Sequence, residues 1–241
     1  MHRLLVDRAL LDEETPVLPA DAARHLRVVR PRPGELVELF DGCGRWRTYA
    51  YDGSGLRRQS DVRALGRPDV SLTLFACVTK GSRWDWTIEK ATELGVTRIV
   101  PVISDRTIVR IPKSERAAKR ERWARIAEDA ARQSDAKWLP EVVEAVDFRD
   151  ALALVKETVC FVGALTDPPS PPLAKSIAAA VASSGVRNLA LGAFVGPEGD
   201  FTPDELAALL AIARPTSFGP TVLRAETAAI FALSVIKGFM V

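Results

Sequence analysis

The sequence is poor in the residues that most metal sites and several catalytic sites require. It has two histidines, His2 and His25, which excludes a multi-histidine metal site and argues against a histidine-dependent catalytic triad. Its three cysteines, Cys43, Cys77 and Cys160, lie far apart and form no Cys-x-x-Cys pair. This pattern predicts no disulfide framework and no metal site, and it favours a reducing, cytoplasmic compartment.

Long apolar runs are also missing. Nothing approaches the roughly 18 consecutive apolar residues that a membrane span requires. The first residues show no apolar segment followed by a small-residue cleavage site, so we expect neither a membrane span nor a signal peptide. Hydrophobic residues make up 47% and charged residues 27% of the 241 positions, which is typical of a globular protein.

Charge is nearly balanced overall, with a net value of +2, but one segment is basic. Residues 105–125 hold eight Lys or Arg against three acids. Two interpretations stay open for this block: a solvated helix face, or a surface that contacts nucleic-acid phosphates, because backbone charge dominates nucleic-acid affinity.

The chain divides into two patterns. Up to about residue 68, short apolar runs separated by Asp-Gly and Gly-Cys-Gly turns predict hairpins of a small β-barrel, with one helix that has Asp21 as its N-cap. From residue 70, apolar strands alternate with helices, which predicts a parallel sheet covered on both faces. We therefore expect an α/β protein with domains at 1–68 and 69–241.

Two loops that contain Gly-Pro sequences follow predicted strands, at positions where ligand-binding sites are expected. In "LGAFVGPEGDFTPDE", a strand ends at a Gly-Pro-Glu-Gly loop, and Thr202, Pro203 and Glu205 predict a capping box that starts a helix. In "FGPTVLRAETAAI", a second strand ends at a Gly-Pro loop before the last helix. Ligands of open α/β sheets bind at such carboxyl ends of strands, so the two loops would line one pocket if they were adjacent.

These two motifs, together with "KGSRWDWTIEKATELGV", "HLRVVR" and "LFDG", resemble the SPOUT-type 16S ribosomal RNA (uracil-N3)-methyltransferases over nearly the whole chain. The resemblance implies an N-terminal PUA-like β-barrel that helps to bind RNA and a C-terminal parallel sheet with a deep trefoil knot. It also implies a homodimer that binds S-adenosylmethionine in the knot and methylates N3 of one uridine in 16S rRNA of the small ribosomal subunit.

The same resemblance assigns residues to the cofactor. The first Gly-Pro loop and the second match the family's two cofactor loops, the end of "CFVGAL" marks a third wall, and Arg-x-Glu-Thr follows the second loop. The expected cofactor-binding residues are Leu165, Val195, Gly196, Pro197, Glu198, Gly199, Phe218, Gly219, Val222, Leu223 and Thr227.

Arg224 and Glu226 are the expected catalytic residues. The uracil N3 proton must be lost before N3 can attack, so Arg224 would stabilise negative charge on the uracil carbonyls. Glu226 or Asp200 would accept the proton, although Glu226 could instead only hold Arg224 in place. We expect Trp84 and Trp86 to pack in the core. The expected RNA contacts are Arg27, Arg30, Arg32, Arg106, Arg110 and Lys137.

Several positions depart from the family pattern. Asp200 stands where the family usually has a third glycine, Thr221 replaces a common arginine, and Ala225 replaces a threonine. In "RQSDAK", Lys137 stands near a position where the family has arginine, whose forked guanidinium a lysine cannot reproduce. Two alternatives therefore remain: a ribose 2′-O-methyltransferase acting on tRNA or rRNA, and a non-catalytic RNA-binding assembly factor.

Overall fold

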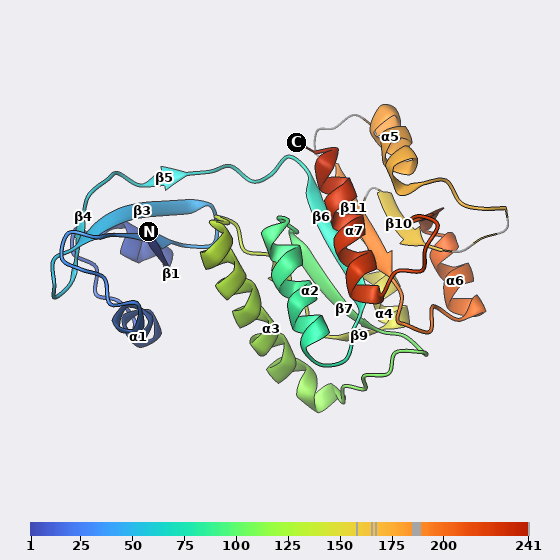
Figure 1. The fold of residues 1–241 in the computed structure, drawn as a ribbon, viewed down its shortest axis with the longest axis horizontal. Coiled ribbons are helices and arrows are strands. Elements are labelled where there is room, and N and C mark those ends of the chain that lie inside the picture. The colour runs from blue at the N-terminus through green and yellow to red at the C-terminus, as the bar shows by residue number, and fades with distance from the viewer. Residues whose placement is uncertain (158, 165, 167, 185–188, 241) are drawn as a thin grey trace. The chain divides into compact units, whose positions relative to one another are not determined.

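The computed structural model describes residues 1–157, 159–164, 166, 168–184 and 189–240. These residues form two compact units (Figure 1). The first unit holds Met1–Arg67 together with Glu128–Leu139, and the second holds Pro68–Ala127 and Pro140–Val241. The sequence pattern places a boundary after residue 68 but gives no sign that Glu128–Leu139 joins the first unit.

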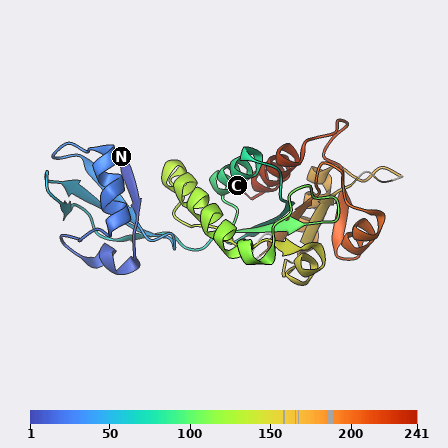
Figure 2. The same ribbon diagram turned by 90° about the horizontal axis from the view of Figure 1, so that it is seen from below.

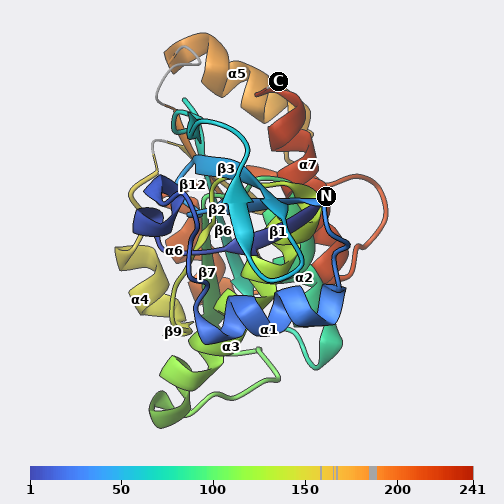
Figure 3. The same ribbon diagram turned by 90° about the vertical axis from the view of Figure 1, so that its left-hand side faces the viewer.

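A five-stranded sheet organises the first unit, in the order β1-β2-β3-β4 with β5 paired to β3. The β1/β2 pair is parallel and the remaining pairs are antiparallel, so the hairpins predicted at the Asp-Gly turns are present. Figure 3 shows α1 beside β1, which it contacts. The elements are β1 (His2–Leu5), the 3-10 helix η1 (Arg8–Asp12), α1 (Ala20–Val29), β2 (Leu36–Phe40), β3 (Arg45–Tyr51), β4 (Leu56–Arg58) and β5 (Arg63–Ala64).

Helix α1 begins two residues earlier than the sequence predicts. Its N-cap is Pro19, with extended backbone and no side-chain cap, so Asp21 lies inside the first turn. A carboxylate in the first turn still suits the positive end of the helix dipole. The helix ends at Arg30, whose left-handed backbone (φ 53°) stops it.

Buried Tyr49 ties the start of the chain to this sheet. Its hydroxyl lies 3.1–3.3 Å from the carbonyl oxygens of Leu10, Leu11 and Glu13. Burial is the main reason that the pKa of Tyr49 is raised, although the neighbouring Arg47 opposes the shift. The phenol therefore stays protonated and can donate to these carbonyls at neutral pH.

A parallel sheet organises the second unit, in the order β12-β10-β11-β6-β7-β8 with β9 paired to β7. The alternation of strands and helices predicted from residue 70 onward is confirmed. The strands are β6 (Ser71–Cys77), β7 (Arg98–Ile103), β8 (Glu141–Val142), β9 (Val146–Asp147), β10 (Val159–Gly163), β11 (Ala190–Val195) and β12 (Ala213–Thr216). The helices are α2 (Ser82–Glu93), α3 (Lys113–Ser134), α4 (Phe148–Ala153), α5 (Leu173–Ser184), α6 (Pro203–Leu210) and α7 (Ala225–Gly238).

Both faces of this sheet are buried, as its continuous apolar strands predict. In β6, Leu72 and Leu74 join one hydrophobic cluster with α2, α5 and α7, whereas Phe75 joins a second cluster with α4 and α6. Figure 2 shows α2 and α7 side by side on one face and α4 on the other. On the second face, Phe75 stacks on Phe194 of β11 at 4.4 Å between ring centroids.

Three short elements were missing from the sequence interpretation. These are β8 and β9, of two residues each, and α4, of six residues. Segments this short cannot display a period of two or 3.6 residues, so no pattern marks them. The strand that precedes the second Gly-Pro loop is β12, which starts at Ala213 and ends at Thr216.

Candidate functional site

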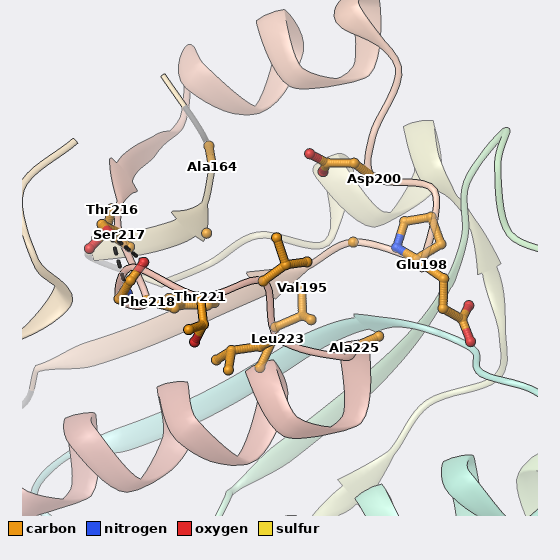
Figure 4. Close-up of a pocket in the computed structure, with 16 residues that line it drawn as sticks. Ala164, Val195, Glu198, Asp200, Thr216, Ser217, Phe218, Thr221, Leu223 and Ala225 are labelled. Carbon is orange, nitrogen blue, oxygen red and sulfur yellow. Dashed lines mark hydrogen bonds between the residues drawn. The ribbon is translucent and has the colours of Figure 1, made fainter. Parts of the chain in front are cut away.

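One pocket lies at the carboxyl ends of β10, β11 and β12, where ligands of parallel sheets bind (Figure 4). The space between its walls, together with the part that is open to solvent, is about 780 Å³. Two loops form most of its wall: the first corner, Val195–Asp200, and the second corner, Ser217–Leu223. The lining residues are Gly163, Ala164, Val195, Gly196, Pro197, Glu198, Asp200, Thr216, Ser217, Phe218, Gly219, Thr221, Val222, Leu223, Ala225 and Ala228.

The structure brings most of the expected cofactor residues together around this pocket. Two of them, Gly199 and Thr227, do not line it, and Leu165 lies outside the described residues. The expected residues that do line it are Val195, Gly196, Pro197, Glu198, Phe218, Gly219, Val222 and Leu223.

A buried carboxylate fixes the exit of the first corner. The capping box predicted for Thr202 and Glu205 is confirmed, with Pro203 at the first helical position of α6. One oxygen of Glu205 accepts from the backbone N–H of Thr202 at 2.9 Å, and the other accepts from the backbone N–H of Asp105, also at 2.9 Å. Glu205 therefore starts α6 and joins it to the loop after β7.

Two arginines hold the first corner from outside. Arg83, in the first turn of α2, forms an ion pair with Glu198 at 2.8 Å between Nη1 and Oε1. Arg106, in the loop after β7, donates from Nη1 to the carbonyl oxygen of Gly199 at 2.9 Å. This contact explains why Gly199 faces Arg106 rather than the pocket, and it gives Arg106 a bracing role that the sequence did not predict.

The second corner has fewer internal contacts. Gly219 has a φ of +119°, a conformation that favours glycine, and its N–H donates to Ser217 Oγ at 3.2 Å. Within the part of the chain that the structure describes, the backbone N–H groups of residues 221–223 have no hydrogen-bond partner. Val222 is 91% exposed. This loop therefore presents unsatisfied donors and an apolar side chain.

Gly163 allows the second corner to approach β10. A Cβ added at this glycine would lie 2.8 Å from Cζ of Phe218, so any larger residue would displace the ring. Gly163 and Ala164 line the pocket, as do Thr216 and Ser217 across the β10/β12 pair. The sequence interpretation missed these four residues, although the end of "CFVGAL" pointed to this wall.

Arg224 and Glu226 follow the second corner directly but do not line the pocket. Arg224 is the N-cap of α7 and is exposed, and no partner for its guanidinium exists within the described ranges. Glu226 is half-buried, and its Oε2 is buried without a hydrogen-bond partner in the described residues. Among the described residues, no ion pair joins Arg224 to Glu226. The structure therefore gives no contact by which Glu226 would hold Arg224 in place.

The predicted RNA contacts fall into two groups. Arg27, Arg30 and Arg32 are exposed in the first unit. By contrast, Arg110 donates to the carbonyl oxygens of Ser104 and Asp105 at 3.2 and 2.8 Å, so it shapes its own loop.

The assignment of Lys137 to RNA needs correction. Its side chain is 10% exposed, and its ammonium forms ion pairs with Glu38 and Asp135 within the first unit. Arg3 joins the same network through Asp135 at 2.8 Å. Lys137 therefore attaches Glu128–Leu139 to the first unit's sheet, a role that depends on contacts between residues about a hundred positions apart.

The prediction that both tryptophans pack in the core is half right. Trp84 is 2% exposed and contacts Trp123 edge-on, whereas Trp86 is 41% exposed. Residues two positions apart on an α-helix of 3.6 residues per turn are related by about 200° of rotation, so the two rings point to opposite sides of α2.

Neither buried cysteine can act as a nucleophile near neutral pH. Burial raises the pKa of Cys77 to about 11 and that of Cys160 to about 12. Both thiols therefore stay protonated. Among the described residues, no group of His, Cys, Asp and Glu is arranged to hold a metal ion, and no described helix is long and apolar enough to cross a membrane.

Comparisons with known proteins agree with this geometry. An RNA methyltransferase domain model matches residues 67–237. The chain is 33% identical to ribosomal RNA small subunit methyltransferase E of Synechocystis, over 99% of this chain and 78% of that protein. It is 32% identical to the protein of the same name from Mycobacterium bovis, over 91% and 85% of the two chains.

Solved structures show the same fold. A Neisseria gonorrhoeae ribosomal RNA small subunit methyltransferase E bound to S-adenosyl methionine has a TM-score of 0.80 at 27% identity, with 99% of this chain and 98% of that chain covered. A Legionella pneumophila protein in complex with the bound cofactor SAM has a TM-score of 0.84 at 27% identity, with 98% and 97% covered.

Proposed function

The chain belongs to the RNA methyltransferase family, and from that membership we propose that it transfers a methyl group from S-adenosylmethionine to N3 of a uridine in 16S ribosomal RNA. The observation that carries this proposal is the pocket that the first and second corners enclose together. Relatives that share the fold over the full chain are solved with the same methyl donor, and those named for ribosomal RNA supply the substrate class.

The pocket residues fit an adenosyl compound. Val195, Leu223 and Ala228 provide apolar surface for a flat purine. The unpaired backbone N–H groups of the second corner are donors for its ring and ribose acceptors. A ligand that supplies acceptors here can replace water at these N–H groups, which a purely apolar ligand cannot do.

When bound, S-adenosylmethionine supplies a methyl group on a positively charged sulfur, and the electron pair of the broken bond stays with sulfur. Arg224 lies immediately after the second corner, where its free guanidinium stabilises negative charge on the uracil carbonyls. Glu226, two residues further along, accepts the N3 proton directly or through water. Alignment of the two reactants contributes roughly 7–11 kcal/mol in well-oriented reactions.

The target uridine must be unpaired when it reacts, because N3 lies on its base-pairing edge. We assign RNA docking to the first unit, as a PUA-like barrel, through exposed Arg27, Arg30 and Arg32. Within the basic block of residues 105–125, Lys113 and Arg125 are exposed. We assign RNA contacts to these two residues instead of to Lys137.

Three further features belong to this proposal: a trefoil knot, a homodimer and a cytoplasmic location. After β12 at one edge of the sheet, the chain returns so that α7 packs on β11 and β6, which suits a threaded C-terminus. Trp86 of α2 and Phe231 of α7 are exposed aromatic side chains on adjacent helices, which suits a dimer contact. A ribosomal RNA substrate suits a cytoplasmic location.

A direct test uses small ribosomal subunits that lack the modification. They are incubated with labelled S-adenosylmethionine, and the digested RNA is examined by mass spectrometry. We expect N3-methyluridine, whereas a 2′-O-methylnucleoside would identify the alternative reaction and no label would identify an assembly factor.

The matched pair of variants is Arg224→Ala and Arg149→Ala, since both arginines are exposed but Arg149 lies on α4, away from the pocket. We expect Arg224→Ala to lower kcat by about 10²–10³-fold, the effect of losing a charge-stabilising donor. Arg149→Ala should stay near wild type. Near-normal turnover of Arg224→Ala would remove this residue from the mechanism.

A further inference from the structure

The charge of the pocket wall differs from that of an RNA-binding surface. Of the residues that line the pocket, the charged ones are Glu198 and Asp200, and both are acidic. Glu198 is neutralised by its ion pair with Arg83. Asp200 has no cation within ion-pair distance among the described residues. One carboxylate is therefore left to face a ligand.

The position of Asp200 is held by its own backbone. Its φ of 60° lies in the left-handed region, which Asp tolerates better than most residues but less well than Gly. Its Oδ1 accepts from the N–H of Phe201 at 2.8 Å, which leaves Oδ2 without a partner in the described residues. In Figure 4 the Asp200 side chain points across the pocket towards Ala164, whereas the Glu198 side chain points away.

We propose that Asp200 is a specificity-determining residue that binds a positively charged group of the methyl donor. This inference rests on the proposed function. It extends that function by naming positive charge as the feature of the methyl donor that Asp200 recognises. Asp200 is exposed, so its attraction for a cation becomes strong when a bound ligand covers the carboxylate and excludes water, which lowers the effective dielectric constant. The donor carries two positive groups, the sulfonium and the amino group of its methionine part.

The resemblance described above implies a glycine at this position. Glycine would relieve the left-handed backbone, but it would leave the wall without the unpaired carboxylate. We therefore expect this protein to discriminate more strongly by ligand charge than a variant that carries the family's glycine.

The test measures binding by calorimetry with three ligands: S-adenosylmethionine, with both positive groups; S-adenosylhomocysteine, with the amino group alone; and 5′-methylthioadenosine, with neither. Asp200→Asn removes the charge and keeps an oxygen for Phe201. Asp200→Gly removes the side chain and relieves the backbone. The control is Asp204→Asn, an exposed acid in the first turn of α6 that does not line the pocket.

We expect both Asp200 variants to bind S-adenosylmethionine about 10-fold more weakly, the scale of one lost charge-assisted contact. Binding of 5′-methylthioadenosine should not change, and Asp204→Asn should match wild type. Equal weakening for S-adenosylhomocysteine assigns the contact to the amino group, and an unchanged value assigns it to the sulfonium.

Unchanged binding of S-adenosylmethionine by the Asp200 variants overturns the inference, as does equal weakening of all three ligands, which would show a structural effect. If wild type binds none of the three, the proposed function fails instead. The two failures are therefore distinguishable in one experiment.

Discussion

The first and second corners have similar sequences, and both end a parallel strand, yet they are held very differently. The first corner is braced by Arg83 and Arg106, which reach it from α2 and from the loop after β7, and Glu205 of α6 fixes Thr202, two residues beyond it. In the second corner, the backbone of Ser217 is hydrogen-bonded to Pro171 and Leu173 and its side chain contacts Gly219. Beyond Gly219 the N–H groups of residues 221–223 have no partner among the described residues, and Val222 projects into solvent.

Because of this difference, the two corners have different roles in ligand binding. A loop fixed by several side chains is organised before the ligand arrives, so little ordering cost remains at binding. A loop with free N–H groups and few contacts has low local stability and gains partners from the ligand. We infer that the first corner provides a preformed wall and that the second corner is completed by the donor.

The largest effect should come from removing the brace that starts α6. Glu205→Ala leaves the N–H groups of Thr202 and Asp105 without their acceptor, so we expect the free energy of unfolding to fall by about 3 kcal/mol. Chemical denaturation measures this, with the exposed neighbour Asp204→Ala as the control. Equal stability of the two variants would contradict the role of Glu205 at the start of α6.

A change beneath the second corner should have a smaller effect. Gly163→Ala places a methyl group against the ring of Phe218, so we expect a loss of about 2 kcal/mol in stability from overpacking. Displacement of Phe218 should also weaken S-adenosylmethionine binding in calorimetry. Gly55→Ala is the matched control, because an added Cβ there meets nothing within 4 Å. A Gly163→Ala protein that binds and unfolds like wild type would show that Phe218 moves freely.

The smallest effect should come from the partly exposed ion pair of the first corner. Arg83→Met frees Glu198, and because such pairs contribute roughly 0–1 kcal/mol, we expect about threefold weaker binding of S-adenosylmethionine. Arg122→Met breaks a similar surface pair with Asp85 that does not touch the corner, so its donor affinity should stay unchanged. If both variants weaken binding equally, the Arg83–Glu198 pair has no special role in the corner.

Features that depend on residues close together in the sequence could be predicted from the sequence alone. The Thr202–Glu205 capping box involves residues three apart, and the apolar strand β6 is long enough to show burial on both faces. Residues such as Gly163 and Thr216 could not be found in this way. They join the pocket because β10 pairs with β12, where Gly163 and Thr216 are register partners 53 positions apart in the sequence.

Side-chain roles were the least predictable. The sequence motif around Lys137 predicted an RNA contact, but the charge of Lys137 is neutralised by Glu38, which is 99 positions away. Arg106 belonged to a basic block, but it donates to Gly199, 93 positions away. A sequence shows the charge of a residue but not which partner removes it from solvent.

By itself the sequence determined that this is an α/β protein with two Gly-Pro loops at strand ends and with the motifs of an RNA methyltransferase. Only the tertiary structure decided that these loops share one pocket, that one of them is braced, and that Asp200 keeps an unpaired carboxylate on the pocket wall. The physical reason is that hydrogen bonding along the chain sets each turn and helix start, whereas the order of strands in the sheet sets which distant residues meet.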